Sequence, residues 1–228
     1  EVYRGAINNI LDNRLYPAFS AIRNLAHETG NHRILSAVDQ HETIYRQMLS
    51  YFTQGAEDPS RDKIRDDIRK ELFTLADLAF SQALSSSPGH IFYDSRNSLS
   101  ASPPISEHYL TSILSQFNAD NPTSYETGIG PLSNVFTDIW MRETFSHEEL
   151  TIIKDATTSE IFSVEIRTLL ITAISLNLFE RFSPELMMLL FDVYEKGENE
   201  IWQRALMGIM ISTIRFDHRM FLYPEVRA

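Results

Sequence analysis

The strongest constraint on the fold is a repeat with a period of 37 residues in the second half of the chain. The pair Phe145-Ser146 recurs as Phe182-Ser183, which sets the period (182 − 145 = 37). Matching side chains follow at equivalent positions: Glu148 and Glu185, Ile153 and Leu190, Asp155 and Asp192, Arg167 and Arg204, Leu169 and Leu206, Ile174 and Ile211, Ser175 and Ser212, Phe179 and Phe216. Such a period is typical of stacked helical hairpins, because one hairpin cannot bury its apolar face alone. The sequence therefore predicts antiparallel helical hairpins stacked as a short α-solenoid.

The composition is that of a folded chain with an acidic surface. The 228 residues are 43% hydrophobic, which suffices for a real core. Acidic side chains outnumber basic ones by 31 to 20, and the net charge of −11 repels phosphate backbones and anionic lipid headgroups. We therefore expect no nucleic-acid partner. The apolar runs are shorter than the ~20 residues of a membrane span, so we also expect no membrane insertion.

The chain contains no cysteine, which excludes disulfides, thiolate chemistry and cysteine zinc ligands. No signal peptide is visible at the start, which is Glu1 rather than a methionine. Both ends read as trimmed. The sequence is thus interpreted as a cytoplasmic segment of a larger protein.

A helical period runs through nearly the whole chain, and nothing reads as a ladder of strands, so the predicted fold class is all-α. Residues 85–104 interrupt the period with seven serines and three prolines. This stretch is predicted to be a Ser/Pro-rich linker or surface loop. It separates an N-terminal helical subdomain at 1–84 from a helical-repeat subdomain at 105–228.

Turn and cap residues predict where the helices break. Asp12-Asn13-Arg14 forms a polar turn, and Gly30 and Gly55 are expected to end the helices before them. A turn region is expected at 121–131, which contains Asn-Pro and Gly-Ile-Gly-Pro. Ser146, followed three residues later by a glutamate, has the spacing of a capping box.

One stretch near the C-terminus gives the clearest amphipathic pattern of the chain. Its apolar side chains fall at i, i+3, i+4, i+7, i+8 and i+12: Trp202, Ala205, Leu206, Ile209, Met210 and Ile214. Spacing of this kind places the residues on one face of a helix. We expect that face to be buried.

From Ile129 onward the sequence resembles the HEAT-type helical repeat family. The resemblance is carried by the period, by the two-helix units, and by an arginine early in the second helix of each unit, Arg167 and Arg204. The unit is shorter than the family's ~40–47 residues, and its aspartates, Asp155 and Asp192, lie twelve residues before the arginines. The resemblance implies a scaffold without catalytic residues that binds proteins or peptides along one face.

The first subdomain is weakly similar to tetratricopeptide hairpins. The positions that carry this similarity are Ala6, Leu11, Leu15, Tyr16, Ala18, Phe19 and Leu25. Most of that family's motif is missing. The similarity therefore adds only an expectation of further helical hairpins.

Two histidine-containing clusters have the composition of a metal site but the wrong spacing. His27 and His32 lie five residues apart, whereas a helical zinc pair needs four. Asp39, His41 and Glu42 lie too close in sequence to converge from one helix, and a surface cluster is the better interpretation. Neither cluster predicts a metal ion.

The remaining polar motifs also favour structural roles. Aspartates at 58, 62, 66 and 67 alternate with cations, which predicts ion pairs four residues apart on a solvated face. Asp217-His218-Arg219 is interpreted as a turn after a helix. No Gly-x-Ser-x-Gly elbow or dinucleotide-binding glycine loop is present. We therefore expect no catalytic residues, no cofactor and no metal.

An acidic set in the last full repeat is the candidate partner-binding site. Its members are Glu185, Asp192, Glu195, Glu198 and Glu200. A row of carboxylates can receive a basic peptide, although an acidic chain also places such residues on faces that contact only water.

Three functions fit these observations. The first is a non-enzymatic helical-repeat module that binds an unknown, basic protein or peptide. The second is an all-α enzyme or small-ligand-binding protein whose site gathers residues from several helices, with the Ser/Pro-rich stretch as a lid. The third is a structural segment that positions other domains. We favour the first, because the repeat is present and no site motif competes with it.

Overall fold

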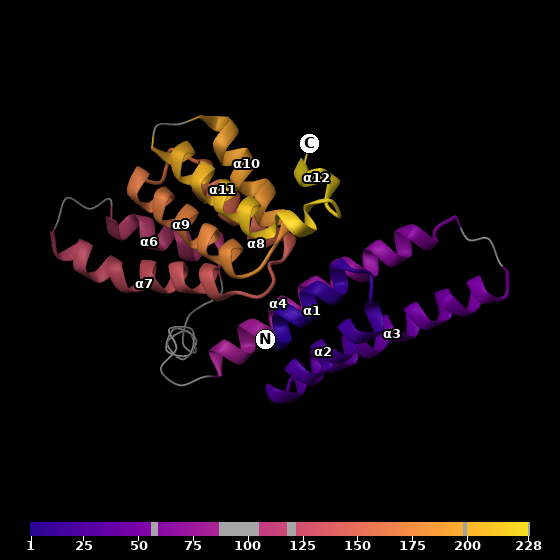
Figure 1. Cartoon of the computed structure of the whole chain (residues 1–228). Helices are drawn as coiled ribbons and strands as arrows, with labels where there is room; N and C mark the ends of the chain where they lie inside the picture. The colour runs from indigo at the N-terminus through magenta and orange to yellow at the C-terminus, as the bar shows by residue number, and fades with distance from the viewer. Residues whose placement is uncertain (56–58, 87–104, 118–121, 198–199, 228) are drawn as a thin grey trace. The chain divides into compact units, whose positions relative to one another are not determined.

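The computed structural model describes residues 1–55, 59–86, 105–117, 122–197 and 200–227, and the side chains of these except at 107, 114–129 and 227. Their regular structure is entirely helical (Figure 1), which confirms the predicted all-α class. The chain divides into two compact units, Glu1–His90 and Ile91–Ala228. Most of the predicted linker lies outside the described residues; its first two serines end a helix.

The first unit consists of four helices separated by short turns. The helices are α1 (Val2–Leu11), α2 (Leu15–Glu28), α3 (His32–Thr53) and α4 (Arg61–Ser85). The predicted breaks are confirmed: Asn13 has a φ of 57°, and Gly30 and Gly55 have φ values of 65° and 78°. Helix α2 packs against α1, α3 and α4, and α3 and α4 continue beyond it as a paired extension (Figure 1).

Two buried charged side chains tie α4 to α1. The guanidinium of Arg69 donates from Nε to the Ile10 carbonyl at 3.3 Å and from Nη2 to the Leu11 carbonyl at 3.5 Å. These carbonyls belong to the last turn of α1, where no intrahelical donor remains for them. At the other end of α1, the Tyr3 hydroxyl donates to Asp77 Oδ1 at 2.7 Å. The first unit is therefore held by polar anchors as well as by its apolar core.

The second unit repeats a helix pair at a constant interval. Its helices are α6 (Glu107–Phe117), α7 (Pro122–Met141), α8 (His147–Thr158), α9 (Val164–Glu180), α10 (Pro184–Lys196), α11 (Ile201–Met220) and the short α12 (Pro224–Arg227). The first residues of α8 and α10 are 37 apart (184 − 147), and so are those of α9 and α11 (201 − 164). The sequence period thus coincides with the interval between helix starts.

The helices of this unit pack as two neighbouring rows. Helix α9 contacts both α7 and α11, while α10 contacts both α8 and α11 (Figure 1). Within each pair the two helices also touch, α8 with α9 and α10 with α11. The core lies between the rows. Its members include Ile153, Leu170, Ile171, Ile174, Leu186, Leu190 and Phe216, all at most 2% exposed.

Serine caps begin three consecutive helices of the second unit, α8, α9 and α10. Ser146, Ser163 and Ser183 each accept a hydrogen bond from the backbone N–H three residues later. The capping box at Ser146 is confirmed, because Glu149 also accepts from the Ser146 N–H at 2.8 Å. Such caps satisfy donors that a helix leaves open at its first turn.

The predicted turn region at 121–131 is wrong. Residues 122–131 lie within α7, which begins at Pro122 and continues through Pro131. Proline at a first helical position costs nothing, since that N–H has no intrahelical acceptor. The interior Pro131 forgoes one hydrogen bond, and we attribute its tolerance to the packing of α7 against α6 and α9.

Helices α9 and α11 approach each other closely at Gly208. A Cβ atom added there would overlap the Ser175 hydroxyl and would lie 2.9 Å from Leu190 Cδ1. Both neighbours come from other helices of the same core. Glycine at this position therefore permits the contact between α9 and α11.

We expect Gly208→Ala to lower the free energy of unfolding of the second unit by about 1–3 kcal/mol, because the new methyl group overpacks the α9–α11 contact. Gly5→Ala is the matched control. Its added Cβ meets nothing within 4 Å, so the better helix propensity of alanine should leave stability unchanged or raise it by up to ~1 kcal/mol. Urea unfolding followed by circular dichroism measures both changes. Equal effects of the two substitutions would contradict the close approach.

Candidate protein-interaction surface

Successive helix pairs are joined by side chains that cap the helix ends of the preceding pair. Asn177 is 2% exposed, and its Nδ2 lies 2.8, 3.1 and 2.9 Å from the carbonyl oxygens of Ile139, Trp140 and Arg142. Arg181 Nη2 donates to the same Arg142 carbonyl at 2.7 Å. The last turn of α7 is therefore capped by α9, and the ends of the two helices are fixed together.

Helices α8 and α10 are joined in the same manner. Lys196 Nζ, at the end of α10, donates to the Thr158 carbonyl at the end of α8. Lys154 of α8 forms an ion pair with Asp192 of α10 at 2.6 Å. The two rows of helices are thus each cross-linked at their C-terminal ends.

The acidic set predicted as a partner-binding site does not gather at one place. Glu185 lies in the first turn of α10 and Glu195 in its last turn, about 15 Å away along the helix axis. Asp192 is neutralised by Lys154. Glu200 precedes α11 with a φ of 65°, and Glu198 lies outside the described residues. The prediction that these residues bind a partner remains a prediction.

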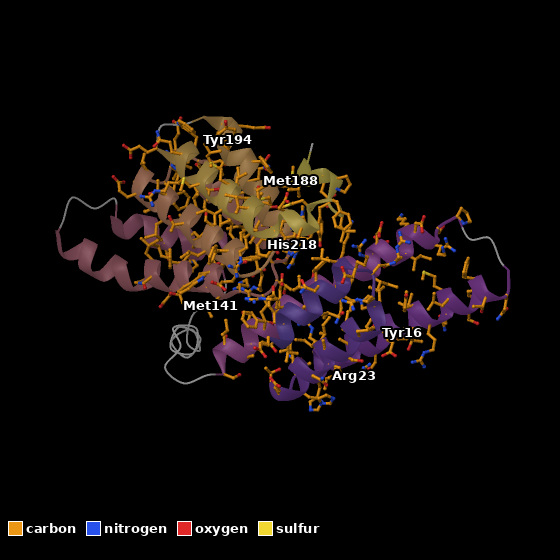
Figure 2. All side chains as sticks on the ribbon, in the orientation of Figure 1. Tyr16, Arg23, Met141, Met188, Tyr194 and His218 are labelled. Atoms are coloured by element: carbon orange, nitrogen blue, oxygen red, sulfur yellow. The ribbon has the colours of Figure 1, made fainter. Side chains whose placement is uncertain are left out.

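Figure 2 shows where α10 carries its exposed apolar side chains. It labels Met188 on the helix and Tyr194 nearer the turn to α11. The Tyr194 ring meets Trp202 of α11 edge-on, with centroids 6.2 Å apart. The aromatic pair therefore belongs to the contact between α10 and α11.

Helix α11 buries a different face from the one predicted. Ala205 and Ile209 are buried, but Trp202 and Leu206 are half-exposed and Met210 and Ile214 are 49% and 77% exposed. The prediction of one buried stripe is wrong for its outer members. The buried face instead passes through Gly208, Ser212, Phe216 and Arg219. Because that face includes small and polar residues, a search for hydrophobic residues at helical spacing does not identify it.

The outer face of α11 carries an exposed apolar stripe, formed by Met207, Met210, Ile211 and Ile214. Their exposures are 56%, 49%, 41% and 77%. The residues fall at i, i+3, i+4 and i+7, so they line one side of the helix. No described residue of the second unit covers this face. A contiguous exposed apolar stripe is a candidate contact surface for another molecule or segment.

Two arginines border this stripe on the side that faces α9. Arg204 Nη1 lies 3.5 Å from Thr172 Oγ1, and the Arg215 guanidinium lies over the Phe179 ring, 4.3 Å from its centroid. Neither arginine forms an ion pair with a carboxylate among the described residues. Their positive charge is thus available at the surface.

A shallow hollow lies at the N-terminal end of the stripe. It has a volume of about 470 Å³ and is lined by Thr168, Glu200, Gln203, Arg204 and Met207. Thr168 comes from α9, Glu200 directly precedes α11, and the other three belong to the first two turns of α11. The stripe therefore leads into a depression large enough for one side chain of a bound molecule.

A larger cleft of about 850 Å³ lies between α6 and α8. Leu110 of α6 and Ile152, Ala156 and Phe162 from α8 and its following turn give it apolar walls. His108, Glu148 and Asp155 stand on its rim. The cleft can accept a small ligand, and sequence reasoning did not find it because its lining comes from two helices without a common motif.

The structure places the predicted histidine-containing clusters at the surface of the first unit. Arg23 binds Asp39 at 2.7 Å and Glu42 at 2.6 Å, and these two carboxylates raise the pKa of its guanidinium. Figure 2 labels Arg23 on α2. Within the described part of the chain, no three metal-binding side chains converge.

The two remaining polar clusters of the sequence, at 62–67 and 217–219, lie in helices α4 and α11. Asp62 pairs with Arg65 at 3.0 Å and Asp66 with Arg69 at 3.3 Å, three residues apart rather than the predicted four; Asp58 lies outside the described residues. Residues 217–219 form the last turn of α11, so the predicted turn there is wrong. The burial of Arg219, 1% exposed, keeps this segment helical and in the core.

Comparisons with known proteins add no relative: the chain matches no family model, and neither a curated protein nor a solved structure matches it significantly. Among the helices described, none has the length and apolarity required to cross a membrane. The surface chemistry described above is therefore the basis for any functional proposal.

We expect Asn177→Ala to lower the free energy of unfolding by about 1–3 kcal/mol, because the Ile139 carbonyl loses this side-chain donor in a buried site and the Trp140 and Arg142 carbonyls keep only Arg181 as a side-chain donor. Asn177→Asp should cost more at neutral pH, since a carboxylate oxygen would face those carbonyls. The control is Asn24→Ala on the exposed face of α2, which should change stability by less than ~0.5 kcal/mol. Urea unfolding of the three variants provides the measurement, and equal stability of Asn177→Ala and Asn24→Ala would disprove the capping role.

Proposed function

We propose that this chain is a non-enzymatic protein-interaction module, built as a short α-solenoid that resembles HEAT-type repeats. Its partner binds the outer face of α11. The observation that carries this proposal is the apolar stripe of Met207, Met210, Ile211 and Ile214, which no described residue of the second unit covers. Helical-repeat scaffolds bind partners along an extended surface, and here that surface is one face of α11.

The packing of the second unit supports the solenoid. The interval of 37 residues between helix starts (184 − 147 and 201 − 164) and the row α7–α9–α11 are what stacked hairpins require. Asn177 caps the end of α7 and Lys196 caps the end of α8, so side-chain hydrogen bonds join α7 to α9 and α8 to α10. Because such a row of helices is already ordered, a partner binds without the entropic cost of ordering the scaffold.

The experiment compares partner capture by three forms of the whole chain: the wild type, Ile214→Asp and Ile161→Asp. Ile161 is 73% exposed and Ile214 is 77% exposed, so both substitutions place a carboxylate on the surface and neither opens the core. We expect affinity capture from cells of the source organism to recover a protein with the wild type and with Ile161→Asp. Its recovery should fall at least about tenfold with Ile214→Asp, because a charge then occupies the apolar contact.

Equal recovery of the same proteins with all three forms would reject α11 as the binding face. Melting temperatures within about 2 °C of one another are the control for folding. The comparison also distinguishes specific binding from general adhesion, since both variants carry the same added charge.

The cleft between α6 and α8 favours the second candidate, a small-ligand-binding protein. Its volume of about 850 Å³ is in the range of ligand pockets. If this function is correct, a member of a metabolite library raises the melting temperature of the wild type, as ligand binding to the native state requires. Thr151→Trp, an exposed position on the cleft wall, should abolish that shift by filling the site. A shift that survives this substitution places the ligand elsewhere.

A further inference from the structure

We infer that the outer face of α11 binds an amphipathic helix whose apolar side is bordered along one edge by carboxylates. This inference rests on the proposed function and adds the chemistry of the partner to it. It also reverses the charge expected from the sequence, where the acidic residues of the last repeat predict a basic partner.

The first argument is the position of the two arginines. Arg204 and Arg215 are eleven residues apart, which is about three helical turns, so they lie on the same side of α11 roughly 16 Å from each other. That side faces α9, as the contacts of Arg204 with Thr172 and of Arg215 with Phe179 require. One long edge of the apolar stripe therefore carries a positive charge near each end.

The second argument is the absence of charge of the opposite sign on the same edge. Between its first-turn Glu165 and its last residue, Glu180, helix α9 contributes no carboxylate, and its one cation in this interval, Arg167, is buried. Asp217 lies two residues after Arg215 and so projects from roughly the opposite side of α11. Glu200, at the hollow beside Arg204, is one exception, and the exposed Glu165, seven residues before Thr172 on the same side of α9, is another. Between Thr172 and Phe179 this edge therefore carries only positive charge, in a chain whose net charge is −11.

The third argument is that the two arginines are held in place before binding. The Arg215 guanidinium stacks on the exposed Phe179 ring, and Arg204 is directed towards Thr172. A positioned guanidinium loses less freedom when it meets a carboxylate than a free one does, and it can bind the carboxylate with two parallel hydrogen bonds. The apolar stripe supplies affinity, and the arginines fix the register and the sign of charge that the surface accepts.

The test uses three synthetic 18-residue helical peptides with the same leucine face and with glutamate, glutamine or lysine along one edge. Each carries the same fluorescent label, and their helicity is matched by circular dichroism. Binding to the whole chain is followed by fluorescence anisotropy. We expect the glutamate peptide to bind about 3- to 10-fold more tightly than the glutamine peptide at low salt, and the difference to shrink at 0.5 M salt.

Charge-reversed and neutral variants identify the source of this preference. Arg204→Gln with Arg215→Gln should remove the preference, and Arg204→Glu with Arg215→Glu should transfer it to the lysine peptide. The matched control is Arg33→Glu with Arg46→Glu, exposed positions on α3 of the other unit. That pair changes the net charge equally and should leave the preference intact. The net charge of −11 alone would favour the lysine peptide, so a preference for glutamate can come only from local charge.

The outcomes separate this inference from the proposed function. If all three peptides bind equally and Ile214→Asp abolishes their binding, the interaction surface stands and the acidic partner is rejected. A preference of the wild type for the lysine peptide also rejects the acidic partner. If no peptide binds, both proposals fail for this face. If light scattering shows a wild-type dimer that Ile214→Asp converts to monomers, the occupant is a second copy of the chain and the acidic helix is again rejected.

Discussion

The capping of helix ends by side chains of neighbouring helices is the interaction on which the second unit depends. Asn177 and Arg181 satisfy the last carbonyls of α7, and Lys196 reaches a last carbonyl of α8. A helix end that is buried without such donors leaves carbonyl groups with no partner, which costs more than the hydrogen bonds contribute when formed. These side chains therefore fix α9 against α7 and α10 against α8, while the apolar core supplies most of the burial.

The same arrangement explains the character of α11. The helix uses small or polar residues, Gly208 and Ser212, where it approaches its neighbours, because close packing leaves no room for large side chains there. Four of its large apolar residues, Met207, Met210, Ile211 and Ile214, lie instead on the outer face. The exposed stripe that they form is the surface to which the proposed partner would bind.

The all-α class, the helix breaks in the first unit and the period of the second could be predicted from the sequence, because each depends on local chemistry. Gly30 and Ser146 act through their own backbone neighbours. The buried face of α11 could not be predicted in the same way. Its apolar residues populate two faces, and only the packing against α9 decides between them. The helix through 122–131 was missed for a similar reason, since local turn propensity was outweighed by packing against two other helices.

For the candidate site, too, the sequence gives the positions of the charged residues, whereas their neighbours are set by tertiary packing. Sequence reasoning located carboxylates by counting them along the chain, but their effect depends on what lies beside them. Asp192 is neutralised by Lys154 of another helix, whereas Arg204 and Arg215 have a ring and a hydroxyl as neighbours and keep their charge. The signal that could have identified the surface is the spacing of Met207, Met210, Ile211 and Ile214, which forms a second stripe that shares Met210 and Ile214 with the predicted one. A helix needs only one apolar stripe to pack against its own core. When it carries a second, exposed stripe, that stripe is the place to look for a partner.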